Sequence, residues 1–165
     1  AVLRRWVRGS RPPACLALDA VGDRAVLRAL KALSNAGPAR ERPRFVPVLF
    51  ESPPPPPDGA PVRGRAVRGI RLFVAKSSSA VAPERLEAAC ADAFRVGGRT
   101  APARLAAAVL AERSLREEDA PVVLEAPCTR RHALVLCQAL AMVPQLCALR
   151  GRDGPSLSCT AQVTY

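Results

Sequence analysis

The stretch Val62–Lys76, V-R-G-R-A-V-R-G-I-R-L-F-V-A-K, decides the fold of this chain. In its second half Ile70, Leu72 and Val74 are apolar and recur at every second position. A period of two with branched apolar side chains predicts a β-strand with one buried face. Because side chains alternate across a strand, we expect Arg71 on the solvent side.

The first half of the same stretch is basic. It carries Arg63, Arg65 and Arg68, and no acid lies between Asp58 and Glu84. Arginines attract phosphate groups whatever the base sequence, so the stretch predicts contact with the backbone of DNA or RNA. Parity puts the odd-numbered arginines on the solvent side of the strand. The expected nucleic-acid-binding residues are Arg63, Arg65, Arg68, Arg71, Arg4, Arg5 and Arg8.

One part of this stretch, R-G-I-R-L-F-V at residues 68–74, resembles the third-strand signature of RNA-recognition domains. In that signature, aromatic side chains on the exposed face of the sheet stack on bases. Here Phe73 is the only aromatic residue, and the first predicted strand offers none. The resemblance therefore implies phosphate contact by arginines more than base stacking.

The charge of the chain is unevenly distributed. The 165 residues, enough for one domain with a proper core, have a net charge of +11. Residues 1–76 hold 15 Lys+Arg against 5 Asp+Glu, so the basic character belongs to the N-terminal half. Basic surfaces attract polyanions. GC-rich coding DNA also produces many arginines, so a protein-binding role stays open.

These features favour a non-enzymatic binding or scaffold domain of a larger protein or complex, which contacts nucleic-acid backbone through its basic half. The alternative is a protein–protein interaction subunit of a multiprotein assembly. A third interpretation is an enzyme that uses Asp19 and Glu125, which end two predicted strands. No nucleophile motif accompanies these carboxylates. We expect no cofactor, and the oligomeric state stays open.

The cysteines predict the compartment. No C-x-x-C occurs among the six, and four lie in apolar patterns, where free cysteine behaves as a small hydrophobe. Reduced thiols and an intracellular location, nuclear or alternatively mitochondrial, are therefore expected. Four possible soft ligands are Cys128, His132, Cys137 and Cys147. The first two share a helix face, but Cys137 turns away and Cys147 follows a proline, so no metal site is expected.

Composition divides the chain into a basic N-terminal arm, residues 1–13, and one domain, residues 14–165. Residues 52–61 include five consecutive prolines and predict an extended surface loop. No run of eighteen apolar residues occurs, so no membrane span is expected.

Periodicity and turn signals predict the order β-α-β-β-α-α-β-α-β. The strands are expected at residues 15–21, 45–51, 70–75, 121–126 and 157–165, and the helices at 23–34, 82–94, 103–116 and 129–142. This order predicts an α/β fold, with α+β also open: one mixed sheet of about five strands, with helices packed on it and a ferredoxin-like start.

Local signals refine the expected elements. Asp23 is a candidate cap for the first helix, and Thr100 and Thr129 for later ones. Pro144 is expected to break or kink the last helix. Pro47 cannot donate a ladder hydrogen bond, so it predicts an edge strand or a bulge.

Overall fold

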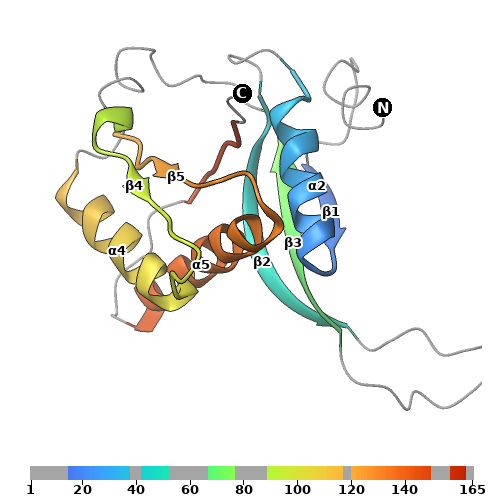
Figure 1. Cartoon of the computed structure of the whole chain (residues 1–165). Coiled ribbons are helices and arrows are strands. Elements are labelled where there is room, and N and C mark those ends of the chain that lie inside the picture. The colour runs from blue at the N-terminus through green and yellow to red at the C-terminus, as the bar shows by residue number, and fades with distance from the viewer. Residues whose placement is uncertain are drawn as a thin grey trace, which may run out of the picture.

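The computed structural model describes residues 15–37, 42–52, 67–76, 89–116, 120–149 and 157–162. In these residues the chain is a mixed α and β protein (Figure 1). The basic arm and nearly all of the proline-rich stretch lie outside the described residues. The elements are β1 (Cys15–Ala20), α2 (Asp23–Ser34), β2 (Arg44–Ser52), β3 (Val67–Ala75), β4 (Phe94–Arg95), α4 (Pro102–Leu115), β5 (Leu124–Glu125) and α5 (Arg130–Leu149).

β3 is the middle strand of a three-stranded sheet, with β1 and β2 antiparallel to it on either side. Its even-numbered residues Ile70, Leu72 and Val74 are 2%, 0% and 0% exposed. The side chain of Arg71, on the other face, is 41% exposed. The strand phase expected from the sequence is therefore confirmed, and Pro47 lies in an edge strand as expected.

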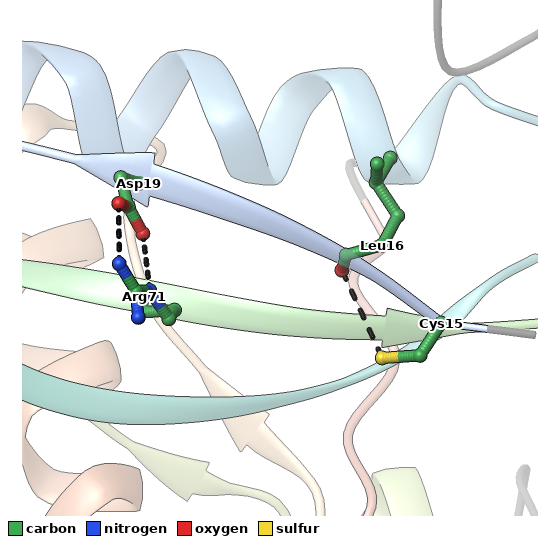
Figure 2. Close-up of polar contacts among 4 residues, drawn as sticks. All are labelled: Cys15, Leu16, Asp19 and Arg71. Carbon is green, nitrogen blue, oxygen red and sulfur yellow. Dashed lines mark hydrogen bonds and ion pairs between the residues drawn. The ribbon is translucent and has the colours of Figure 1, made fainter. Parts of the chain in front are cut away.

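Two helices cover the inner face of this sheet. Val26 and Leu33 of α2 and Ala133 and Cys137 of α5 form one buried cluster with the even-numbered residues of β3. Full burial of a Val or Leu side chain contributes about 1.5–3 kcal/mol relative to exposure. In Figure 2 the side chain of Leu16 extends toward α2. The odd-numbered face of β3 is thereby left as the outer face.

The second part of the chain is built on the opposite side of α5 (Figure 1). β4 and β5 pair in parallel, and α4 connects them along the chain. Leu105 and Val109 of α4 pack with Val143 and Cys147 of α5 in a second buried cluster. α5 thus contributes to both cores, which joins the two parts.

The expectation of one mixed sheet is wrong, because the strands of the described residues form two sheets. Residues 121–126 read as a central strand, yet only Leu124–Glu125 pairs. The apolar run has another cause: Leu124 and Ala126 pack against the second cluster. The predicted helix at residues 82–94 also ends too late, since residues 89–91 are helical and Phe94 is in β4.

Two of the three expected helix caps differ in the structure, whereas Thr129 caps α5 as expected, with its hydroxyl accepting from the backbone N–H of His132. α2 has the expected bounds, but Gly22 is its N-cap, with a φ of 81° that disfavours other residues. The N-cap of α4 is Ala101 instead of Thr100. α5 continues through Pro144 to Leu149. Buried side chains on both sides of this proline, at 143 and 147, hold the helix together despite the missing backbone donor.

α5 is also the described helix that is long and apolar enough, by length and composition, to cross a membrane. Its packing against α2, α4 and β2 gives a physical reason for that composition, because a helix shared by two cores needs apolar residues around most of its circumference.

The predicted last strand makes a single bridge in the described residues. Cys159 exchanges two backbone hydrogen bonds with Phe45 of β2, at 2.8 and 2.9 Å. Residues 163–165 lie outside the described residues. The described residues 157–162 therefore contact the outer edge of β2 at Phe45.

The cysteine thiols, all six of which are free, should react in two classes. Cys15, Cys90 and Cys128 are exposed. Burial raises the pKa of the Cys137 and Cys159 thiols to about 12, and Cys147 is buried. We expect three thiols of the native protein to react rapidly with a disulfide reagent at neutral pH, and all six after denaturation. A rapid native count of five or six would contradict the described packing.

Candidate functional site

The outer face of the three-stranded sheet carries the polar side chains predicted to be functional. Asp19 of β1 lies directly across from Arg71 of β3. The Arg71 Nε donates to Asp19 Oδ1 at 2.6 Å, and its Nη2 donates to Oδ2 at 2.8 Å (Figure 2). Two parallel bonds of this kind hold both side chains in one orientation.

The third strand joins this arrangement through Phe50 of β2, which lies opposite Gly69 in the register. A Cβ atom on Gly69 would lie 2.7 Å from the Phe50 ring, so the glycine leaves room for that ring. The Arg71 guanidinium is 5.3 Å from the ring centroid, a cation–π distance. Asp19, Arg71, Phe50 and Gly69, the cross-sheet cluster, thus link all three strands.

The charges of the cross-sheet cluster compensate each other. The hydrogen bond from Arg71 lowers the pKa of Asp19 below its usual value, and the same bond raises the pKa of Arg71. Arg68 is also paired, with its Nε 2.6 Å from Glu51 Oε1. Both described arginines of the predicted binding stretch therefore face a carboxylate, which lowers their attraction for phosphate. Arg63, Arg65, Arg4, Arg5 and Arg8 lie outside the described residues.

The outward-facing positions of β3 differ from those of the RNA-recognition signature. When Arg68-Gly69 is aligned with the start of that signature, its stacking aromatics fall at positions 70 and 72. Ile70 and Leu72 are both buried in this chain. The aromatic residues of the outer face are instead Phe73 and Phe50, and Phe50 already contacts Arg71. The strand therefore has no aromatic residue where the signature stacks bases.

Beside the cross-sheet cluster the outer face is apolar. Ala17, Phe73 and Val46 lie in one row across the three strands. Phe73 is 41% exposed, and Val48 in the next row is 40% exposed. This apolar row with Val48 forms an apolar patch at the surface of the described residues.

Five of the described cations that form no ion pair lie on two helices. Arg24, Arg28 and Lys31 follow one side of α2, and Arg130 and Arg131 begin α5. None of these five, the helical cations, forms an ion pair within the part of the chain that the structure describes. The nucleic-acid-binding residues expected from the sequence did not include these five. The i, i+4 and i+7 spacing of the three α2 cations is the signal that identifies them.

Asp19 and Glu125, the carboxylates of the third interpretation, do not lie on neighbouring strands. Asp19 belongs to the three-stranded sheet and Glu125 to the other, where Arg95 Nε is 3.8 Å from its Oε2. The structure therefore does not bring these two carboxylates together as an acid–base pair.

Soft ligands do not gather either. No group of three or more metal-ligating side chains occurs among the described residues. Cys137 and Cys147 are buried in different clusters. The His132 Nδ1 is 2.7 Å from Thr129 Oγ1, which fixes the ring at the start of α5. The Thr129 hydroxyl also accepts from the backbone N–H of His132, at 3.4 Å.

Comparison with known proteins gives no relative, since no protein-family model, curated protein or solved structure matches this chain.

The Asp19–Arg71 pair should make stability depend on pH. Because the pKa of Asp19 is lowered in the folded state, the pair stabilises the fold above the unfolded-state pKa of about 3.9. That contribution is lost as the pH falls through the lower folded-state value. We expect Asp19→Asn to reduce the urea midpoint slightly near pH 6, and the difference between the two proteins to be smaller near pH 3.

A matched control is Asp92→Asn, an exposed acid with no ion pair in the described part of the chain. It should follow the wild type at both pH values. An Asp19→Asn midpoint equal to that of the wild type near pH 6 would show that the pair contributes nothing.

Proposed function

We propose that this chain is a non-enzymatic, intracellular and chiefly nuclear binding domain that contacts the phosphate backbone of DNA or RNA through the helical cations. The observation that carries the proposal is the distribution of paired and unpaired charge. Arg68 and Arg71 of the sheet face carboxylates, whereas the five helical cations have no acid partner in the described chain. Unpaired cations release counterions when they meet phosphates, and that release drives non-specific affinity.

The spacing on α2 suits a phosphate chain. From Arg24 to Lys31 the helix rises about 10 Å at 1.5 Å per residue. A nucleic-acid strand carries one phosphate per roughly 3.4 Å of rise, so three cations along this length can each meet a charge. The side chains of Arg24 and Arg28 are exposed, so they can reach a ligand without unfolding.

The start of α5 supports the same function, because its cations lie where the helix dipole disfavours positive charge. Its first turn contains Arg130 and Arg131 and no acid, at the helix end where the backbone dipole is positive. Each cation there costs about 0.3–1 kcal/mol of helix stability. A bound phosphate would offset this destabilisation, because helix N-termini attract anions. A locally unfavourable placement of this kind is typical of functional residues.

The proposal includes a ferredoxin-like order of the first strands and helix. β3 lies between β1 and β2, and α2 packs on the resulting sheet. This arrangement supports the ferredoxin-like start expected from the sequence, in which one face is left for ligands.

The proposal predicts which substitutions weaken nucleic-acid binding. Replacing Arg24, Arg28 and Lys31 together by glutamine should weaken binding about equally for unrelated sequences. The slope of log affinity against log salt should decrease by roughly 0.7–0.9 for each phosphate that the variant no longer neutralises. Arg130→Gln with Arg131→Gln should also weaken binding while raising the urea midpoint, because it relieves the helix dipole.

The control is Arg68→Gln with Arg95→Gln, which removes two exposed arginines that face carboxylates. It should leave the salt slope unchanged. An equal loss of affinity in this control would assign binding to overall charge instead of the helical cations. Absence of wild-type binding at physiological salt would remove the proposal and favour the second candidate.

The second candidate function is a protein–protein interaction subunit. The observation that favours it is the apolar patch on the outer face, where Phe73 and Val48 are each about two-fifths exposed. Exposed apolar patches next to polar residues are typical of protein interfaces.

The patch should be required for any stable partner of the native complex. We expect Phe73→Ser to abolish stoichiometric co-purification of that partner without loss of the fold, since the ring lies on the outer face and is 41% exposed. Leu115→Ser, at an 84% exposed leucine of α4, should retain the partner. Retention by both variants would exclude the patch as an interface.

A further inference from the structure

The two edges of the three-stranded sheet differ. At the β2 edge, Phe45 exchanges two backbone hydrogen bonds with Cys159. β1 pairs with β3 on one side, and on its other side no strand of the described residues pairs with it. Alternate backbone N–H and C=O groups of an edge strand point away from the sheet, where they are ready to pair with another extended chain.

β1 also lacks the usual protection of an edge. Its sequence, C-L-A-L-D-A, contains no lysine and no proline, and no bulge interrupts its register with β3. Its single charged residue, Asp19, is paired with Arg71 on the outer face, so its charge does not oppose the pairing of another strand with β1. The strand is therefore chemically open to a further strand.

The side chains of β1 show what an added strand would cover. Leu16 and Leu18 are only partly buried, whereas their partners Val74 and Leu72 in the central strand are 0% exposed. On the outer face Ala17 is exposed beside Phe73. A strand paired with β1 would meet apolar neighbours on both faces, which favours an extended segment rich in β-branched residues.

We propose that the β1 edge, residues 15–20, binds an extended segment of an acidic partner protein by strand addition. The backbone ladder supplies most of the affinity, as in other strand-addition complexes. Charge decides against a second copy of this chain. A β1–β1 pair would bring together two α2 helices, each with Arg24, Arg28 and Lys31, from chains of net charge +11. The same positive field attracts a segment flanked by carboxylates.

Hydrogen exchange of the β1 amides tests the inference directly. In the free protein at low concentration, alternate amides of β1 should exchange rapidly, whereas those of β3 stay protected. The probe is a synthetic peptide of alternating valine and threonine with two glutamates at each end. Its addition should protect the rapidly exchanging β1 amides and leave β2 unchanged. The same peptide with a central proline, which cannot complete the ladder, should protect them much less.

Two substitutions distinguish peptide binding at the β1 edge from attraction by the overall charge of the protein. Ala17→Glu places a carboxylate on β1, and Ala32→Glu places the same charge on the exposed side of α2. Affinity for the acidic peptide should fall at least tenfold more in Ala17→Glu than in Ala32→Glu.

Three results would overturn the inference. Slow exchange of every β1 amide in the free, dilute protein would show that another part of the chain covers the edge. Protection that appears only as protein concentration rises would assign the edge to a second copy. No protection of β1 by the peptide at millimolar concentration would exclude strand addition. Each readout is independent of nucleic-acid binding by the helical cations.

Discussion

Burial of alternate side chains of β3 beneath α2 and α5 is the constraint on which the other features depend. Leu72 and Val74 are fully buried, so the strand phase is fixed: a shift by one residue would place Arg71 in the core and those side chains in water. With this phase fixed, Arg71 must lie on the outer face opposite Asp19, and Gly69 must lie beneath the Phe50 ring. The cross-sheet cluster is therefore a consequence of core burial.

Elements with a strong local pattern were predictable from the sequence, and those defined by distant contacts were not. The period of two in β3 and the spacing of Val26, Leu30 and Leu33 in α2 are local, and both elements form as expected. β4 and β5 are each two residues long, which is too short for an alternation of apolar and polar side chains to be detected. The continuation of α5 through Pro144 depends on packing against α4, which a proline rule cannot anticipate.

The charge pairs of the candidate site also depend on distant contacts and were not predictable from the sequence. Net charge identified a basic half, and parity placed Arg71 correctly on the surface. Neither property shows that Asp19, 52 positions away, neutralises Arg71, or that Glu51 pairs with Arg68. The segments between these partners carry no acid pattern that reveals the pairing, because antiparallel register alone brings the carboxylates into place. Unpaired charge can thus be assigned only after the strands are aligned.

The resulting separation of charge follows from the layered fold. α2 covers the inner face of the sheet, so its solvent side and the outer face of the sheet point in opposite directions. Cations on the helical side have no carboxylate across from them, because neighbouring strands supply opposing partners and a solvent-facing helix side does not. The sheet side, with Arg71 already neutralised, combines apolar residues with a paired charge. Under the two proposals, a polyanion would contact the helical cations and a protein strand would pair with the β1 backbone, while both ligands would be attracted by the same positive charge of α2.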